Sequence, residues 1–185
     1  LIRDTAPKED VEAIAQNLNR MDAMIDDLLT MARAGSTVED TEPVGLAAVA
    51  RTAWSHTDTA DFAFDCRVPE AVPVEADRDR LLHVFENLFR NAIDHNDPPV
   101  TVTVDSLDSA GERGFCVADD GGGMSPEERA NAFEHGYTTS EDGTGLGLSI
   151  VSDIVDGHGW DVRVVESAGG GARFEVTGVD VEREA

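Results

Sequence analysis

Two asparagines and a histidine recur at four-residue intervals in the segment ENLFRNAIDHN, residues 86–96. An α-helix has about 3.6 residues per turn, so Asn87, Asn91 and His95 share one face of a predicted helix. Amide oxygens are hard ligands suited to Mg²⁺, which usually also keeps waters and phosphate oxygens. By itself this pattern also fits an exposed polar face.

The segment VADDGGGM, residues 117–124, runs from an apolar strand into Asp119 and then into a glycine turn. A carboxylate at a strand end accepts hydrogen bonds and could recognise an exocyclic amine such as that of adenine. Gly121 and Gly123 would let the backbone approach a flat base closely. The alternative is a tight acidic turn without a ligand.

Three glycines alternate in DGTGLGLSIV, residues 142–151, immediately before a predicted helix. The segment lacks the Lys-Ser/Thr pair of a Walker A loop, and it follows a polar loop where a dinucleotide fingerprint follows a strand. What remains is a helix start whose free N–H groups face an anion. Without a lysine, such a site needs another cation, most simply Mg²⁺. A helix start that is closely packed for steric reasons is the alternative.

These segments require a scaffold of strands and helices. Alternating apolar residues and glycine turns predict strands at 62–68, 100–107, 113–119, 160–167 and 172–179, the last two joined by the glycines at 169–171. Helices are predicted at 46–56, 78–95, 125–133 and 148–159. Asp77 or Asp79 could cap the second of them, and Ser125, Pro126 and Glu128 form a strong start for the third. The composition predicts an α+β two-layer sandwich with a mixed sheet and helices over one face.

Residues 8–34 are predicted to form one amphipathic helix with the seam of a coiled coil or helical bundle. The apolar positions are Val11, Ile14, Leu18, Met21, Ile25, Leu28 and Ala32. Such a helix needs partners to bury its apolar stripe. We therefore divide the chain into a helical segment at 1–35, a linker at 36–45, a globular domain at 46–180 and a tail at 181–185.

The chain carries a formal net charge of -24 and a single lysine, Lys8. With no basic patch to meet phosphates, nucleic acid is not expected as a partner. The charge favours a protein of a high-salt cytoplasm, the alternative being an ordinary acidic domain. Cys66 and Cys116 do not make a disulfide framework. No apolar run reaches the roughly 18 residues of a membrane span. Because the chain begins with Leu1, a membrane anchor could lie upstream.

Together, the three segments resemble the ATP-binding domain of sensor histidine kinases, which share a superfamily with DNA gyrase B, mismatch-repair ATPases and a heat-shock chaperone. NLFRNAIDH is similar to the N box of this family, DDGGGM to its first glycine box, FEHGYTT to its F box and GTGLGL to its second glycine box. RMDAMIDDLLTMARAG resembles the second helix of the family's dimerisation and phosphotransfer hairpin. The resemblance covers residues 46 to about 180 and extends to this first helix.

The resemblance implies a Bergerat-type fold that binds Mg-ATP. Asn91 would be the principal Mg²⁺ ligand with Asn87 beside it, His95 would lie near the phosphates, and Asp119 would recognise the adenine amino group. Residues 134–142 would form a lid. The remaining expected nucleotide contacts are Gly121, Gly123, Met124, Tyr137, Thr138, Gly143, Thr144, Gly145, Leu146, Gly147 and Leu148.

One position separates branches of this superfamily. The ATPases carry a water-activating Glu one turn before the magnesium Asn, and here that residue is Asn87, whose amide is not a useful base. Glu86 should point about 100° away around the helix. This favours phosphoryl transfer to a protein side chain over hydrolysis. The sequence departs from the family at Asp94, where many relatives have Lys, and at Ala172, where Thr is common.

The family's phosphoacceptor His lies on the first hairpin helix and is followed by an acidic residue. No histidine here fits that pattern, so we expect the phosphoacceptor helix to be absent from this sequence. The predicted function is the catalytic half of a sensor histidine kinase, whose intact parent would dimerise through the N-terminal helix and pass the phosphoryl group to a response-regulator receiver domain in the cytoplasm. Alternatives are a Ser/Thr kinase of the anti-sigma type and a nucleotide-binding or dimerisation module without turnover.

Overall fold

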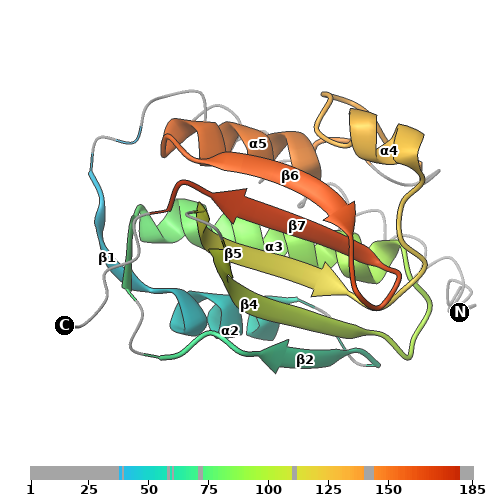
Figure 1. Ribbon diagram of the computed structural model, residues 1–185, viewed down its shortest axis with the longest axis horizontal. Helices are drawn as coiled ribbons and strands as arrows, with labels where there is room; N and C mark the ends of the chain where they lie inside the picture. Colours follow the sequence, from blue (N-terminus) through green and yellow to red (C-terminus); the bar gives the residue numbers. More distant parts are fainter. Residues whose placement is uncertain are drawn as a thin grey trace, which may run out of the picture.

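The computed structural model shows a five-stranded mixed sheet covered on one face by helices (Figure 1). It describes residues 38, 40–57, 59, 61–70, 73–109, 112–139 and 144–179. The predicted N-terminal helix at 8–34 and the tail at 181–185 lie outside these ranges. The predicted α+β two-layer sandwich is confirmed.

The elements follow one another as short strands and four helices in the described ranges. The helices are α2 (Leu46–His56), α3 (Arg78–Asp94), α4 (Pro126–Asn131) and α5 (Gly147–Gly157). The strands are β1 (Glu42–Gly45), β2 (Ala63–Cys66), β3 (Pro73–Ala76), β4 (Thr101–Ser109), β5 (Glu112–Asp119), β6 (Asp161–Glu166) and β7 (Ala172–Thr177). The large sheet has the order β2-β4-β5-β7-β6, in which β2 and β4 are parallel and the other neighbours antiparallel.

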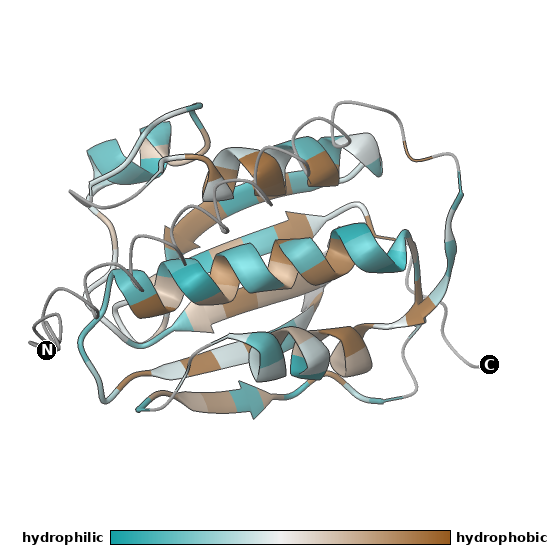
Figure 2. Ribbon diagram, turned by 180° about the vertical axis from the view of Figure 1, so that it is seen from behind, coloured by the Kyte–Doolittle hydropathy of each residue, from teal (hydrophilic) through white to brown (hydrophobic). Residues whose placement is uncertain are grey.

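Helices α2, α3 and α5 lie side by side against the sheet, with α3 in the middle (Figure 2). The apolar side of α3 packs onto β5, where the rings of Phe85 and Phe115 lie 5.2 Å apart. Phe89 packs edge-on against Trp54 of α2. Burial of such side chains contributes about 1.5–3 kcal/mol each. The polar side of α3 is consequently fixed in direction.

The start of α3 is capped and tied to the end of α5. The Asp77 carboxylate accepts hydrogen bonds from the backbone N–H groups of Asp79 at 3.0 Å and Arg80 at 3.1 Å, so Asp77, rather than Asp79, is the cap. The Asp77 N–H in turn donates to Nε2 of His158, just after α5, at 3.1 Å. This hydrogen bond joins α5 to the start of α3, the end of the helix that lies opposite its polar residues Asn87, Asn91 and His95.

The structure corrects the predicted linker at 36–45 in its last four residues. These form β1, which pairs antiparallel with β3, a strand that the sequence analysis did not predict. Val44 and Val74 face each other in this pair and are both buried. Each strand has only four residues, so its pairing depends on a partner that is distant in sequence.

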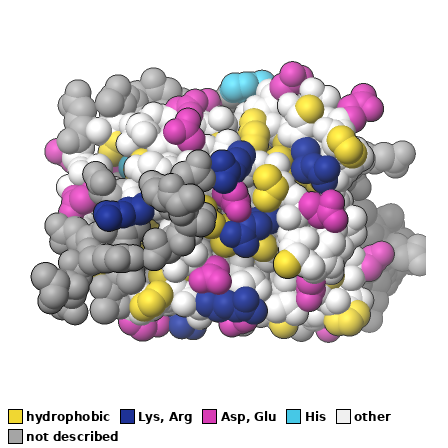
Figure 3. All heavy atoms as spheres, in the orientation of Figure 1, with side chains coloured by type: hydrophobic (Ala, Val, Ile, Leu, Met, Phe, Trp, Pro, Cys, Tyr) yellow, Lys and Arg dark blue, Asp and Glu magenta, His cyan; other side chains and the backbone are white. Residues whose placement is uncertain are grey.

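Where Figure 3 shows the other face of the sheet, arginines and acidic side chains are interleaved on it. Glu175 on β7 accepts from Arg163 at 2.8 Å and from Arg173 at 2.7 Å. Each pair joins a partly exposed arginine to Glu175, whose side chain is only 12% exposed. Within the part of the chain that the structure describes, no helix has the length and apolar character needed to cross a membrane. The segments with candidate chemistry lie at the helical layer.

Candidate nucleotide site

A pocket opens between the second half of α3, the segment around α4 and the start of α5, with a volume of about 280 Å³. It collects residues from all three segments that the sequence analysis singled out. The lining residues are Asn87, Arg90, Asn91, Asp94, His95, Gly123, Met124, Glu128, Ala132, Tyr137, Thr138, Thr139, Thr144, Gly145, Gly147 and Leu148.

Helix α3 contributes a continuous polar stripe to this pocket. Its members are spaced by three and four residues, as one face of a helix requires. Because the opposite face is buried against the sheet, the stripe cannot rotate away from the pocket. It comprises Asn87, Arg90, Asn91, Asp94 and His95.

Asn87 is held in a defined orientation. Its Nδ2 donates to the backbone oxygen of His83 at 2.9 Å. Its Oδ1 lies next to Gly147, where an added Cβ would approach that oxygen to 3.0 Å. The amide oxygen is therefore directed at the start of α5, and glycine at position 147 leaves room for it.

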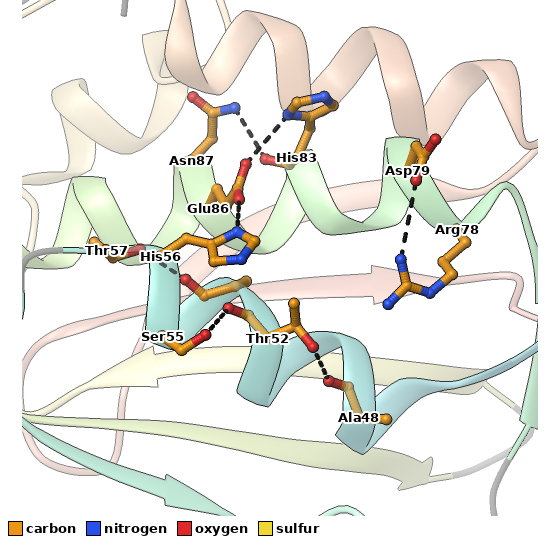
Figure 4. Close-up of polar contacts among 11 residues, drawn as sticks. Ala48, Thr52, Ser55, His56, Thr57, Arg78, Asp79, His83, Glu86 and Asn87 are labelled. Atoms are coloured by element: carbon orange, nitrogen blue, oxygen red, sulfur yellow. Dashed lines mark hydrogen bonds and ion pairs between the residues drawn. The ribbon is translucent and has the colours of Figure 1, made fainter.

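Glu86 points away from the pocket, toward α2 (Figure 4). Its carboxylate lies 2.9 Å from Nδ1 of His56 and 3.2 Å from Nδ1 of His83. Burial works to raise the pKa of Glu86, but the hydrogen bonds from His83 and His56 outweigh it and lower the pKa. A carboxylate that is engaged and of low pKa, and does not line the pocket, is a poor base for water there.

The stripe carries one guanidinium and one carboxylate four residues apart, Arg90 and Asp94. Burial raises the pKa of Asp94, against the attraction of Arg90 and His95. Arg90 supplies positive charge at the pocket, where the sequence analysis named Mg²⁺ as the simplest cation in the absence of a lysine. Asp94 adds a carboxylate in the same stripe, which gives this wall mixed charge.

The glycine segment before α5 forms a tight turn against residue 136. Gly145 has a φ of +67°, and an added Cβ would meet the Gly136 carbonyl carbon at 2.6 Å. The Gly136 N–H donates to the Gly145 oxygen at 3.0 Å. No side chain caps the first turn of α5 among the described residues. The backbone N–H groups of the first turn of α5 therefore point toward the pocket.

Asp119 lies apart from the pocket lining and is almost fully buried, with 6% of its surface exposed. Its Oδ1 accepts from the Gly121 N–H at 3.0 Å, and its Oδ2 accepts from the Ala172 N–H at 3.3 Å. Burial raises the pKa of Asp119, while these backbone hydrogen bonds oppose the rise. The turn at 120–123 connects it to Gly123, which does line the pocket.

The pocket brings together most of the expected contacts. Those that line it are Asn87, Asn91, His95, Gly123, Met124, Tyr137, Thr138, Thr144, Gly145, Gly147 and Leu148. Asp119, Gly121 and Leu146 do not line it. Gly143 and residues 140–142 of the expected lid lie outside the described residues.

The sequence analysis missed five lining residues as contacts. Arg90 and Asp94 could have been found by continuing the stripe of α3 by three and four residues. Glu128 was assigned only to the start of α4, where its carboxylate accepts from the Ser125 N–H at 2.6 Å. Thr139 belongs to the FEHGYTT segment and to the expected lid at 134–142, but it was not named as a contact. Ala132 has no local signal, because its place in the pocket depends on how α4 packs.

Comparison with known proteins places this site in context. The sequence profile described as "Histidine kinase-, DNA gyrase B-, and HSP90-like ATPase" matches residues 76–182, which is more than half of the chain. Sensor histidine kinase ZraS of Salmonella typhi is 38% identical over 104 residues, covering 56% of this chain and 22% of that protein. The chain thus spans about a fifth of the length of this relative.

Two solved structures are also similar. The mycobacterial sensor histidine kinase MprB superposes with a TM-score of 0.66 at 26% identity, covering 79% of this chain and 100% of that one. Full-length ShkA in complex with AMPPNP superposes with a TM-score of 0.70 at 30% identity, covering 95% of this chain and 39% of that one. The profile match runs from the end of β3 beyond β7 and so includes every wall of the pocket.

Proposed function

Because the chain belongs to the family of histidine kinase-, DNA gyrase B- and HSP90-like ATPases, we propose that its pocket binds Mg-ATP for transfer of the γ-phosphoryl group to a histidine. One observation carries this proposal. The polar stripe of α3 and the glycine start of α5 face the same pocket, although about 60 residues of sequence separate Asn87 from Gly147. A helix start and amide oxygens at the same pocket suit a phosphate chain with its cation.

The donor set fits Mg²⁺. Asn87 and Asn91 offer amide oxygens at the pocket. Asn87 uses its amide nitrogen for the hydrogen bond to His83, so that bond does not engage its amide oxygen. Hard oxygen donors with space for waters and phosphates are the surroundings that Mg²⁺ prefers. When bound, the ion would neutralise phosphate charge. We propose Asn91 as the principal ligand, with Asn87 beside it and His95 near the phosphates.

Transfer is favoured over hydrolysis by the residues around the stripe. Asn87 occupies the position of the water-activating glutamate, and an amide cannot serve as the base. The neighbouring Glu86 is engaged by His56 and His83 on the α2 side. The chain's own residues would thus bind and orient ATP without activating water.

The remaining parts of the proposal concern the intact parent. The segment at 1–35 would be the second helix of a dimerisation hairpin and 46–180 the ATP-binding domain. The parent would dimerise through that hairpin, phosphorylate a histidine outside this sequence, and pass the group to a receiver domain in the cytoplasm. The net charge of -24 supports a high-salt cytoplasm. Circular dichroism that does not change between dilute buffer and molar KCl would contradict that last point.

Titration calorimetry with ATP tests the binding site. We expect binding that requires Mg²⁺ and is lost in Asn91→Ala, while Asn131→Ala on α4, outside the pocket lining, binds like the wild type. Similarity to the AMPPNP-bound ShkA supports this expectation. No binding by the folded wild type would refute the proposal and favour a module without nucleotide chemistry.

Phosphate release tests the choice between transfer and hydrolysis. The chain alone should release phosphate from ATP no faster than Asn91→Ala. Sustained turnover by the wild type that Asn91→Ala abolishes would contradict phosphotransfer as the main activity and support an ATPase.

A further inference from the structure

Two segments that are distant in sequence, the end of α3 and the turn between β6 and β7, converge on Asp119 at the end of β5. Asn96 lies two residues after α3, and Ser167 directly follows β6. The turn at 169–171 packs so closely on Asp119 that a Cβ at Gly171 would overlap its carboxylate and backbone oxygen. No residue of the polar stripe of α3 takes part in these contacts.

Ser167 ties the β6–β7 turn to the backbone of Asp119. Its buried hydroxyl donates to the Asp119 backbone oxygen at 2.6 Å. The same oxygen atom accepts from the N–H groups of Gly169 at 3.2 Å and Gly171 at 3.0 Å. One side chain therefore bonds three backbone groups, the Asp119 oxygen and the N–H groups of Gly169 and Gly171, and joins the end of β5 to the turn at 169–171.

Asn96 approaches the carboxylate from the other side. Its Nδ2 donates to the Ala92 backbone oxygen at 2.8 Å and lies 3.5 Å from Oδ1 of Asp119. Its Oδ1 accepts from the Gly122 N–H at 2.8 Å. The amide thus fixes the end of α3, the glycine turn and the carboxylate relative to one another.

The polar contacts to the Asp119 carboxylate come from N–H groups. The donors are the backbone of Gly121 and of Ala172 and the amide of Asn96. A carboxylate offers about four acceptor positions, so one can still receive a ligand hydrogen. Burial and the neighbouring charge of Asp120 raise the pKa of Asp119, whereas these donors lower it. The net shift is upward, so it is the three N–H donors, and not the pKa, that favour Asp119 as an acceptor.

We propose that Asn96 and Ser167 are positioning residues that hold the Asp119 carboxylate as a hydrogen-bond acceptor and thereby set a preference for 6-amino over 6-oxo purine nucleotides. This inference rests on the proposed function. The nucleobase would reach Asp119 at the end of the pocket lined by Gly123 and Met124. A 6-amino group donates to a carboxylate, while a 6-oxo group presents a second acceptor and is repelled.

The test compares Mg-ATP with Mg-ITP by titration calorimetry, since their bases differ mainly at this position. The key variant is Asn96→Asp, which keeps the side-chain shape and the acceptor for Gly122 but turns the donor facing Asp119 into an oxygen. We expect the wild type to bind ATP more tightly than ITP. Asn96→Asp should reduce the ratio of these two affinities about tenfold, the scale of one hydrogen bond to a charged group. Asn131→Asp changes the net charge equally and should leave the preference unchanged.

Ser167→Ala supplies a second variant that adds no charge. We expect a lower melting temperature together with a narrowed ATP preference. If the folded variants bind ATP and ITP more weakly by the same factor, or keep the wild-type preference, the inference is overturned. If Asn96→Asp does not fold, the ratio in Ser167→Ala decides. A wild type that binds neither nucleotide would refute the proposed function, a result distinct from a wild type that binds both without preference.

Discussion

The two ends of the proposed nucleotide site are built in different ways. Around Asp119, backbone N–H groups and two buried or half-buried side chains surround a carboxylate that is almost closed off from solvent. Around Asn91, the walls are side chains on one helix and a glycine turn on another, and they leave a pocket between them. At the Asp119 end, hydrogen bonds within the protein fix the polar groups in place, whereas at the Asn91 end polar side chains face the pocket.

This difference has a physical basis. A base is flat and carries little charge, so its recognition benefits from hydrogen-bonding groups that are already aligned. A triphosphate brings several charges and a cation. Charged side chains that bind it must keep contact with water, because burying an unpaired charge is costly. The end around Asp119 should therefore be sensitive to shape, and the end around Asn91 to charge.

The largest effect is expected where the Asp119 end is tightest. Gly171→Ala places a methyl group on Asp119 backbone, which cannot move as a flexible side chain can. We expect a loss of about 3 kcal/mol in the free energy of unfolding, the upper part of the range for overpacking. Urea unfolding measures it.

Gly122→Ala is the matched control in the facing turn. Its added Cβ would lie 3.9 Å from Oδ1 of Asn96, an ordinary contact. It should cost less than about 1 kcal/mol, as surface substitutions usually do. Equal losses for the two variants would contradict close packing against Asp119 as the cause of the loss in Gly171→Ala.

Charge should dominate at the phosphate end. Arg90→Gln keeps a polar side chain but removes the guanidinium from the pocket wall. We expect ATP affinity to fall about tenfold, as for the loss of one charge-assisted hydrogen bond, and adenosine affinity to stay unchanged. Calorimetry with both ligands separates these effects.

Arg78→Gln provides the control for Arg90→Gln. Arg78 lies at the start of α3, outside the pocket lining, and pairs with Asp79 at 4.0 Å (Figure 4). Its replacement removes the same charge from the chain. A similar drop in ATP affinity for both variants would point to the overall charge of the protein and not to the pocket.

The contact between α3 and α5 lies away from both ends and should respond to pH. Burial lowers the pKa of His158 below its ordinary value of 6.5, and its Nε2 must be unprotonated to accept from the Asp77 N–H. The unfolded chain therefore binds the proton more readily, so stability should fall as pH decreases through and below about 6.5. Urea unfolding between pH 7 and 5 measures the slope.

His158→Gln isolates this contribution, because an amide oxygen can accept without titrating. Its stability should decline less over that interval, by about 1 kcal/mol, the net value of one hydrogen bond. Any pH-dependent contribution from the rest of the chain is common to both proteins and cancels in the difference. Parallel curves for the wild type and His158→Gln would rule out His158 as the source.

The smallest effect is expected at Asp94. Asp94→Asn removes a negative charge from the pocket wall while preserving shape, so ATP should bind about threefold more tightly. Molar KCl should reduce the gain, since salt screens exposed charges. Weaker ATP binding by Asp94→Asn would indicate that this carboxylate contributes to holding the cation.

Local patterns predicted the elements that carry the site. The spacing of Asn87, Asn91 and His95 required a common helix face, and the Ser125 start of α4 was recognised from a capping box that the structure contains. The strands β1 and β3 are different, because four-residue strands have little periodicity and depend on each other. Ala172 drew attention only as a departure from Thr, whereas its backbone N–H is what contacts Asp119.

The sequence by itself determined which faces of α3 are polar and apolar, where α5 starts with glycines, and which side chains could bind a phosphate or a base, since these depend on neighbours within a few residues. Only the tertiary structure decided that Ala132 joins the pocket wall, that Glu86 turns to His56 and His83, and that Ser167 and Asn96 meet at Asp119. Those contacts join segments up to 71 residues apart, from Asn96 to Ser167. Hydrogen bonds over such separations follow from packing and sheet register, which no local pattern specifies.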